Sequence, residues 1–428
     1  MTSLNGKPSS LIPDFDKLSI DERLRHVERF AGLSEEDMQQ LRAPSNLDRE
    51  LANHMIENMV ATIAIPVGVA TGLRIDGEEF LVPMATEESW IISAVGNAAQ
   101  ACHDTGGFTT SASGSCMIAQ VQLLGLTNPH SARIAILEKR NEIAAECAAC
   151  DPTLTRFGGG FHDLEVRILG EGADAMVVVH LIIDCRDAMG ANTVNTMAER
   201  IAPKLQAWTG GRPALRILSN LADRRLVRAR ATWIPEALGG EAVRDAILEA
   251  YRFAEVDPYR AVTNNKGIMN CVSAVVLATG NDTRAVEAAA HGYAAASGRI
   301  RSLTKWEVAP DGALAGSIEL PMPVGLVGGA VKIHPTARAL VAILGVKSAE
   351  HLGRIIAAIG LAANFAALKA LSTHGIQKDF MAHHARNFAI GAGATGDEID
   401  LVARSLVERR SISTAAAEQV LAEVRKSR

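Results

Sequence analysis

The segment DAMGANTVNTMAE, residues 187–199, decides the fold that we predict for this chain. The apolar run Met176–Ile183 precedes it and is typical of a buried strand. After it, apolar residues recur at helical spacing as far as Leu205, and Asn192 or Thr193 is placed to cap the helix. A strand therefore leads through a tight turn to a helix N-terminus, whose free N–H groups and dipole favour an anion such as a pyrophosphate. On spacing alone, an ordinary strand-to-helix turn is the more common explanation.

Strands and helices alternate around this segment, from about residue 115 to residue 219. Their expected order is strand, helix, strand, strand, helix, strand, which is that of a ferredoxin-like unit rather than of a doubly wound sheet. The strands are expected at Ile118–Leu124, Leu164–Leu169, Met176–Ile183 and Leu215–Leu218, with one charged helix at Ala132–Cys150 and another that includes Val194.

Outside this unit the sequence mainly favours helices. One hairpin is expected over residues 68–83, because Asp76-Gly77 between two apolar runs is a turn signal. The segment Asn264–Gly267 is expected to form a polar loop. Helices are expected within residues 14–55, at Gly240–Phe253, in Ala-rich stretches at 284–297 and 337–371, and near the C-terminus at 397–408 and 413–426.

The composition is that of a globular protein. The chain has 428 residues, enough for two or three domains, of which 48% are hydrophobic and 21% charged. A net charge of −5 argues against nucleic acid or an anionic membrane as the main partner. The longest apolar run, Met59–Leu73, is interrupted by proline and glycine and is too short to cross a bilayer. Six scattered cysteines are typical of reduced thiols in a cytoplasm, and the single CxxC at residues 147–150 has no second pair, so we expect no metal.

The amino-acid sequence of residues 187–199 resembles the dinucleotide-binding signature of the 3-hydroxy-3-methylglutaryl-coenzyme A (HMG-CoA) reductases. Further segments match that family in the same order and together cover nearly the whole chain, in the manner of the short, soluble class II enzymes of bacteria. These segments are Glu57-Asn58, VPMATEE (82–88), GGFTT (106–110), DPYR (257–260), NKGIMN (265–270), ATGND (278–282) and PMPVGLVGG (321–329).

The resemblance implies an α+β fold with a large, mainly helical substrate domain, an inserted small ferredoxin-like cofactor domain and a C-terminal helical flap. On this plan residues 1–114 and 220–375 form the substrate domain, residues 115–219 the dinucleotide-binding domain and residues 376–428 the flap. The family places each active site between two subunits, so the resemblance also implies a homodimer. We expect it to be cytoplasmic.

The reaction that the resemblance implies interconverts HMG-CoA and mevalonate plus coenzyme A by two hydride transfers, with NAD(H) as the cofactor. Each hydride addition creates an oxyanion, which needs a cation or strong hydrogen-bond donors nearby. The aldehyde oxygen finally needs a proton, and so does the departing coenzyme A thiolate. The sequence is compatible with both directions, synthesis and oxidation of mevalonate.

Three residues match the catalytic residues of the family. By this resemblance we expect Lys266, in the expected loop Asn264–Gly267, to be the cation that stabilises the oxyanion. The resemblance also implies that Glu88 is the proton donor to the carbonyl oxygen and that Asp282 links the lysine and the glutamate by hydrogen bonds. Without the resemblance, Lys266 would be taken for a solvated loop lysine, and Gly-Asn-Asp at Asp282 for a simple turn.

Other positions are assigned to the substrate and the cofactor. Arg260 resembles the residue that pairs with the substrate carboxylate, a geometry suited to guanidinium, and Asn270 resembles an amide ligand of the same group. Asp151 resembles an aspartate that favours NAD over NADP, because a carboxylate repels a 2′-phosphate. An ordinary helix-end aspartate would have the same sequence context. The cofactor-binding segment comprises Asp187, Met189, Gly190, Ala191 and Asn192.

The chain departs from the family at Phe380, which stands where the family has the histidine that protonates the thiolate. His383 is the first candidate substitute, because it lies three residues on and is an addition relative to the family. His384 is the second candidate, and both histidines could equally be surface residues. An alternative interpretation is therefore a catalytically impaired paralogue that binds coenzyme A thioesters as a regulatory protein. A Rossmann-type acyl-CoA dehydrogenase lacks support, because the GxGxxG at 391–396 has too little chain after it for a βαβ unit.

Overall fold

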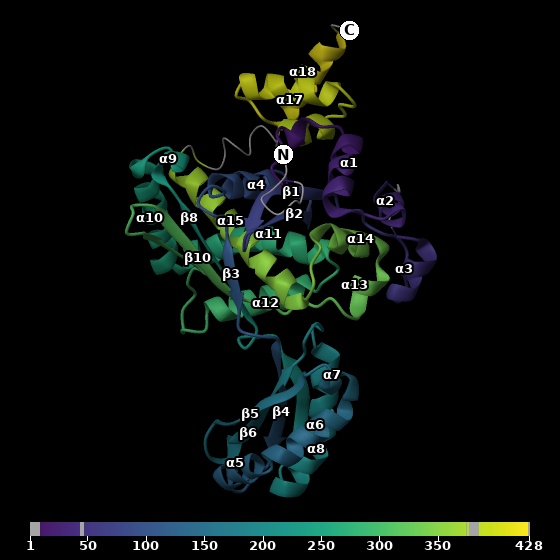
Figure 1. The fold of residues 1–428 in the computed structure, drawn as a ribbon, viewed down its shortest axis with the longest axis vertical. Helices are drawn as coiled ribbons and strands as arrows, with labels where there is room; N and C mark the ends of the chain where they lie inside the picture. Colours follow the sequence, from purple (N-terminus) through teal and green to yellow (C-terminus); the bar gives the residue numbers. More distant parts are fainter. Residues whose placement is uncertain (1–8, 43–46, 374, 376–384, 427–428) are drawn as a thin grey trace.

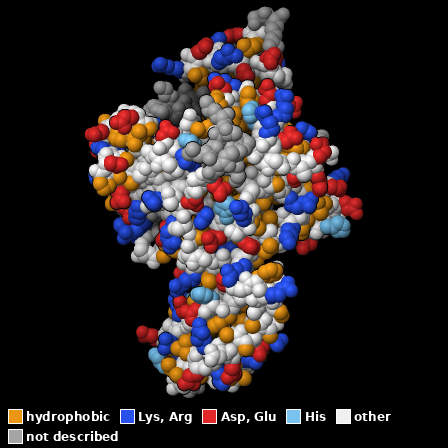
Figure 2. All heavy atoms as spheres, viewed as in Figure 1, with side chains coloured by type: hydrophobic (Ala, Val, Ile, Leu, Met, Phe, Trp, Pro, Cys, Tyr) orange, Lys and Arg blue, Asp and Glu red, His pale blue; other side chains and the backbone are white. Residues whose placement is uncertain are grey.

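The computed structural model describes residues 9–42, 47–373, 375 and 385–426 of the chain. They form a mixed α+β fold, and the fold class expected from the sequence is confirmed at that level. One four-stranded sheet lies among most of the helices, and a second lies in a smaller unit that projects from them (Figure 1). The C-terminal helices lie at the opposite end of the molecule from the small unit (Figure 1). Acidic and basic side chains are interspersed over the face shown in Figure 2.

Two long helices, α11 (Pro258–Ala278) and α15 (Ala349–Ser372), form the core of the large unit. They pack on each other, and α15 covers one face of an antiparallel sheet with the strand order β3-β8-β10-β9. The sequence patterns did not predict this sheet. Its strands are β3 (Thr109–Ala112), β8 (Leu226–Trp233), β9 (Thr304–Val308) and β10 (Leu314–Pro321).

Helix α11 corrects one prediction, because it runs straight through Asn264–Gly267, where we expected a polar loop. Asn264 and Asn265 are buried rather than solvated, with 4% and 0% of their surface exposed. Asn265 Nδ2 donates to Arg301 O at 2.8 Å, and Asn265 Oδ1 accepts from Leu303 N at 3.1 Å. These contacts with distant parts of the chain outweigh the weak helix propensity of asparagine and glycine.

A buried network of amides and hydroxyls joins α11, α15 and β9, and Asn364 of α15 is at its centre. Asn364 Nδ2 donates to Asn264 Oδ1 at 2.8 Å. Asn364 Oδ1 accepts from Thr304 Oγ1 at 2.7 Å and from Trp306 Nε1 at 2.9 Å. Ser302 Oγ accepts from Asn264 Nδ2 at 2.9 Å. Buried polar groups are costly unless they are paired, so this network fixes how the three elements sit against one another.

The described residues of the N-terminal part add four α-helices and the expected hairpin. Strands β1 (Val67–Ile75) and β2 (Glu78–Ala85) pair antiparallel. Asp76 and Gly77 between them have positive φ angles of 51° and 82°, which a tight hairpin turn requires. The predicted hairpin is therefore confirmed. The helices of this part are α1 (Ile20–Ala31), α2 (Glu35–Arg42), α3 (Arg49–Met55) and α4 (Ile91–Ala101), with a short 3-10 helix η1 (Phe15–Lys17).

The small unit has an antiparallel sheet with the strand order β5-β6-β4-β7 and its own apolar core. Its strands and long helices follow the expected order, except that the helix predicted at Ala132–Cys150 is broken into two at Lys139. Two short helices, at Pro152–Arg156 and Gly172–Asp174, were not predicted. The elements are β4 (Cys116–Leu124), α5 (Pro129–Glu138), α6 (Arg140–Cys150), α7 (Pro152–Arg156), β5 (Gly160–Leu169), η2 (Gly172–Asp174), β6 (Met176–Asp184), α8 (Ala191–Thr209) and β7 (Arg212–Ser219).

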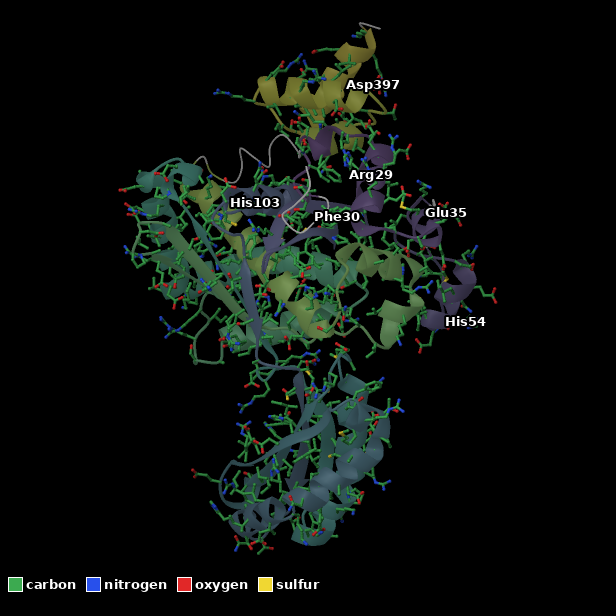
Figure 3. The ribbon with its side chains drawn as sticks, in the orientation of Figure 1. Arg29, Phe30, Glu35, His54, His103 and Asp397 are labelled. Atoms are coloured by element: carbon green, nitrogen blue, oxygen red, sulfur yellow. The ribbon has the colours of Figure 1, made fainter. Side chains whose placement is uncertain are left out.

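The remaining helices complete the large unit and form a C-terminal group. In the large unit they are α9 (Pro235–Leu238), α10 (Glu241–Val256), α12 (Thr283–Ala294), α13 (Gly329–Ile333) and α14 (Pro335–Leu344). In the C-terminal group, α17 (Glu398–Glu408) and α18 (Thr414–Lys426) share a separate core with helical residues 385–391. Asp397, which precedes α17, marks this group in Figure 3.

Within the described ranges, α15 is the one helix long and apolar enough to cross a membrane. Of its most apolar window, 72% is buried inside the protein. A helix that is apolar on all sides is also what the core of a large globular unit requires, and α15 occupies that place here.

Replacing Asn364 by leucine should destabilise the protein, because Asn264, Thr304 and Trp306 would lose hydrogen bonds inside the core. We expect a loss of about 2–4 kcal/mol in the free energy of unfolding, measured as a lower melting temperature. Asn141→Leu, on the exposed surface of α6, is the matched control. Equal melting temperatures for the two variants would contradict the structural role of the network.

Candidate active site

Lys266 and Glu88, which are far apart in the sequence, meet in the structure. The Nζ atom of Lys266, on α11, lies 3.6 Å from Oε2 of Glu88, in the segment between β2 and α4. The Lys266 side chain is 64% exposed and that of Glu88 is 29% exposed. An ion pair this accessible to water adds little to stability. Its chemical value is that a cation and a carboxyl group can reach the same substrate oxygen.

The position of Lys266 follows from the buried residues just before it on α11. Asn264 and Asn265 are held by the amide network and by the 301–303 segment, which fixes the rotation of the helix about its axis. Beside Gly267, just after Lys266, the described residues place no atom within 4 Å of the position that a Cβ would take, apart from the helix's own backbone and the two neighbouring residues. The helix is therefore anchored on its inner side and open beside the lysine.

Glu88 lies in a short turn between β2 and α4. Its N–H donates to Thr86 Oγ1 at 3.0 Å. Two residues later Trp90, the N-cap of α4, has a φ angle of 80°, which a residue with a Cβ rarely adopts. Such conformations persist where the surrounding structure enforces them, and they are common beside functional groups.

Asp282 is the N-cap of α12, and within the described residues it makes no hydrogen bond or ion pair with Lys266 or Glu88. Its Oδ1 accepts from Arg284 N at 3.0 Å and from Ala285 N at 3.2 Å, and Arg284 Nε lies 3.1 Å away. Partial burial acts to raise the pKa of Asp282, but the bonds from Arg284 and the backbone outweigh it, so the pKa lies below its ordinary value. Its catalytic link to the pair stays a prediction.

Arg260 and Asn270 lie on the same helix as Lys266. The Arg260 N–H donates to Asp257 Oδ2 at 2.7 Å, which begins the helix. Nothing in the described part of the chain pairs with the Arg260 guanidinium, whose pKa is lowered by partial burial. Asn270 lies four residues after Lys266 and so on the same face, and its side chain has no hydrogen bond to a described residue. One helix thus presents a cation, an amide and an unpaired guanidinium.

Helix α8 begins at the turn that we expected to bind the cofactor. Its N-cap, Gly190, has a φ angle of 102°, and a Cβ there would lie 2.4 Å from Cys185 Sγ, so the position requires glycine. Glycine offers no capping side chain, and the N–H groups of Ala191, Asn192 and Thr193 have no acceptor among the residues described. The first turn carries no acidic residue. These free donors fit an anion such as the pyrophosphate of a dinucleotide.

Asp187 lies in the turn before this helix, and its carboxylate is tied to the large unit. Its Oδ1 accepts from Ala349 N, at the start of α15, at 2.8 Å. Its carbonyl oxygen accepts from Leu326 N, also at 2.8 Å. Met189 follows in the same turn. Both residues therefore lie where the segment that we expected to bind the cofactor contacts the large unit.

Asp151 is the N-cap of α7, because its Oδ1 accepts from Leu154 N at 2.8 Å. This is the helix-end role that the sequence left open as an alternative. The second carboxylate oxygen makes no hydrogen bond to the described residues. A role in cofactor choice stays a prediction.

Phe380, His383 and His384 lie outside the described residues. No group of three or more His, Cys, Asp or Glu side chains in the described ranges could hold a metal ion.

A cleft of about 920 Å³ on the outer face of the β3-β8-β10-β9 sheet is lined by Arg230, Lys305 and Tyr293 among others, but by none of the predicted site residues. The contact of Lys266 with Glu88 is therefore separate from this cleft.

Comparison with known proteins identifies the family. The family model described as hydroxymethylglutaryl-coenzyme A reductase matches residues 19–385. The 3-hydroxy-3-methylglutaryl-coenzyme A reductase of Archaeoglobus fulgidus is 49% identical over 417 residues, which cover 97% of this chain and 95% of the relative. A probable reductase of the same name from Borreliella burgdorferi is 32% identical over 386 residues, which cover 87% of this chain and 85% of the relative.

Solved structures agree with the sequence relatives. The 3-hydroxy-3-methylglutaryl-coenzyme A reductase from Streptococcus pneumoniae has a TM-score of 0.82 and 35% identity, and the match covers 96% of this chain and 99% of that chain. A structure of the class II enzyme from the same organism, bound to NADPH in open conformations, has a TM-score of 0.81 and 36% identity, with coverage of 95% and 100%. This chain belongs to the hydroxymethylglutaryl-coenzyme A reductase family, and its fold is that of a class II enzyme.

Proposed function

We propose that this chain interconverts HMG-CoA and mevalonate plus coenzyme A by two hydride transfers, with NAD(H) as the cofactor. HMG-CoA reductase activity, an oxidoreductase reaction of the mevalonate pathway, follows from family membership and from 49% identity to a curated relative over 97% of the chain. The observation that supports the assignment of the residues is the contact between Lys266 and Glu88.

Lys266 and Glu88 act on the oxygen of the carbonyl that is reduced. When bound, the nicotinamide cofactor supplies one hydride to the thioester carbon and a second to the aldehyde carbon. Each addition turns the C=O bond into an oxyanion, whose charge the Lys266 ammonium stabilises. Glu88, 3.6 Å from that ammonium, gives the oxygen its proton. Asp282 is assigned to the same site from its ATGND motif.

The substrate carboxylate pairs with Arg260 in this proposal. An unpaired and partly buried guanidinium is suited to a carboxylate, because its planar donors can bind both oxygens. Asn270, one helical turn after Lys266, adds an amide donor to the same group. Binding of the acyl group along α11 would bring its carbonyl towards Lys266.

Coenzyme A leaves as a thiolate when the C–S bond of the thiohemiacetal breaks, and the thiolate must take up a proton. Phe380 cannot supply one. We propose His383 as the donor and His384 as the second candidate; both lie outside the described residues. Phe380 also favours the second candidate function, a catalytically impaired paralogue that still binds coenzyme A thioesters.

The cofactor binds at the N-terminus of α8 in this proposal, where the free N–H groups meet its pyrophosphate. The segment comprises Asp187, Met189, Gly190, Ala191 and Asn192. NAD(H) is preferred because the carboxylate of Asp151 would repel the 2′-phosphate of NADP(H). The class II enzyme from Streptococcus pneumoniae binds NADPH in one of its solved structures, so cofactor choice in this chain needs a direct measurement.

We also propose the domain plan and the assembly. Residues 1–114 and 220–375 form the substrate domain, residues 115–219 the ferredoxin-like cofactor domain and residues 376–428 a C-terminal flap. A homodimer with shared active sites is supported by the run of exposed apolar side chains before β1, where Val60 is 87% and Ile63 is 91% exposed. The expected location is the cytoplasm.

Lys266→Ala should lower turnover by roughly a thousandfold, because the main stabiliser of the oxyanion is removed. The dissociation constant of HMG-CoA should change little, since Arg260 and Asn270 remain. Nicotinamide absorbance with purified protein, HMG-CoA and each cofactor in turn measures the rate. Lys305→Ala, which removes an exposed lysine from its 2.8 Å pair with Glu255, is the control. Wild-type turnover in the Lys266 variant would rule out the assignment.

Asp151→Asn separates charge from capping, because asparagine keeps the oxygen that accepts from Leu154 N. The variant should improve kcat/KM for NADPH relative to NADH by about 1–2 kcal/mol, since a repulsion in a partly solvated site is relieved. Asp163→Asn removes another carboxylate of the small unit, paired with Arg140 at 3.3 Å, and should leave the ratio unchanged. An unchanged ratio in Asp151→Asn would exclude a role in selectivity.

His383→Gln should depress HMG-CoA reduction but spare the reduction of free mevaldehyde, because only the first reaction releases a thiolate. Phe380→His should raise the thioester reaction. Both half-reactions are followed by nicotinamide absorbance, with His54→Gln on the exposed surface of α3 as the control (Figure 3). Equal loss in both half-reactions would exclude His383. Wild-type protein that reduces mevaldehyde but not HMG-CoA would favour the impaired paralogue.

A further inference from the structure

Arg225, between the small unit and β8, is a buried cation whose hydrogen bonds go to backbone carbonyls. It is 3% exposed, and within the described residues it forms no ion pair. Burial lowers the pKa of its guanidinium. A buried charge is costly unless its hydrogen bonds are satisfied, so the contacts that satisfy it indicate why it is there. It donates to four backbone carbonyls: Ala188 at 2.9 Å, Met189 at 3.2 Å, Arg186 at 3.3 Å and Val324 at 2.6 Å.

These four carbonyls belong to two segments that are distant in sequence. Three of them come from the turn 186–189, which ends at the N-cap of α8. The fourth comes from the segment 322–327, which follows β10. One guanidinium therefore joins the turn that leads into the proposed cofactor site to the large unit. Lysine could not make the same contacts, because its ammonium is a single point with three donors, whereas the guanidinium is a planar fork with five.

The two segments also touch each other directly. Ala188 and Val327 form a parallel β-bridge. Gly325 lies so close to the turn that a Cβ on it would be 2.5 Å from Met189 N. A side chain at this position would push the turn away. Two features therefore keep the turn 186–189 in close contact with segment 322–327. One is the lack of a side chain at Gly325, and the other is the set of hydrogen bonds from Arg225 to both segments.

The segment 322–327 is in turn bound to the turn that carries Asp282. Gly325 N donates to Asn281 Oδ1 at 2.7 Å, and Asn281 immediately precedes Asp282, the N-cap of α12. Asn281 Nδ2 is held by Thr279 Oγ1 at 3.2 Å. Hydrogen bonds therefore connect the start of α8, through segment 322–327, to the start of α12.

We propose that Arg225 is a positioning residue that, together with the close approach at Gly325, fixes the start of α8 relative to the large unit that carries Lys266 and Asp282. The proposal rests on the proposed function of residues 187–192 as the cofactor segment. Hydride transfer depends on the separation and orientation of the reacting atoms, so a turn displaced by about 1 Å could lower the rate a hundredfold. Arg225 touches neither substrate nor cofactor in this role.

The test uses full-length Arg225→Lys and Gly325→Ala, with Arg244→Lys as the matched control. Arg244 is also largely buried, with 12% of its side chain exposed, and donates to a backbone carbonyl, Gly312 O at 2.9 Å, but it lies on α10. In both test variants the dissociation constants of NADH and NADPH should rise about tenfold and kcat should fall at least as much. The KM for HMG-CoA should stay within about twofold of the wild-type value. General destabilisation of the protein would not weaken cofactor binding while leaving HMG-CoA binding unchanged.

Hydrogen exchange gives a readout that does not depend on catalysis. Backbone amides of residues 186–194 should exchange faster in Arg225→Lys than in wild type or Arg244→Lys, because local opening becomes easier. Unchanged exchange there, or equal loss of affinity for HMG-CoA and cofactor, would overturn the proposal. If Arg225→Lys does not fold, Gly325→Ala tests the same contact and must show the same split, and its absence would overturn the proposal too.

Failure of the proposed function would look different. NADH or NADPH added to wild type should protect the amides of residues 190–194 from exchange. If neither cofactor does so, the cofactor segment is wrong, whatever the Arg225 variant does. If wild type is protected and Arg225→Lys exchanges and binds as wild type does, the cofactor segment stands and the role of Arg225 is refuted.

Discussion

The hydrogen bonds that surround Asn364 fix α11, and the arrangement of the site depends on them. An amide donates and accepts at once, so Asn364 joins Asn264 of α11 to Thr304 and Trp306 of β9. Apolar contacts alone would let a helix slide or rotate at small cost, because the hydrophobic effect has no direction. The amide network prevents such movement, because any displacement of a partner would leave a buried polar group unpaired. The rotation of α11 places Lys266 on the side of Glu88.

The hydrogen bonds left unmade are equally informative. Helices α11 and α12 begin with aspartate caps, and α15 begins with a serine cap. Helix α8 begins with glycine and no capping side chain, although a side-chain cap is worth about 1 kcal/mol. Helices α10 and α13 also begin with glycine and no capping side chain, so what distinguishes α8 is that its first turn resembles a dinucleotide signature. Free N–H groups there and the unpaired guanidinium of Arg260 are the donors that anionic ligands require.

Local patterns predicted the parts of the fold that depend on local physics. Asp76-Gly77 predicted the hairpin because these residues tolerate the positive φ angles of its turn. The periodicity of apolar residues predicted the order of strands and helices in the small unit, because each of these elements buries one face in a shared core. The same reasoning missed the sheet β3-β8-β10-β9, in which β3 with β8 and β8 with β10 pair across large separations in sequence. The local hairpin of β9 and β10 at the edge of this sheet was missed as well. It also missed α11 at Asn264–Gly267, where long-range hydrogen bonds override a low helix propensity.

The sequence by itself determined which side chains are proposed as the reactive groups, since its motifs match the family at Glu88, Lys266 and Asp282. Only the tertiary structure decided which of them meet. In the structure, Lys266 Nζ lies 3.6 Å from Glu88 Oε2, whereas the Asp282 carboxylate caps the start of α12. The physical reason is that a motif specifies side chains and local backbone, whereas the distance between two motifs is set by the helices and buried polar contacts between them. The proposed role of Arg225 also depends on the tertiary structure, because none of its carbonyl partners lies next to it in the chain.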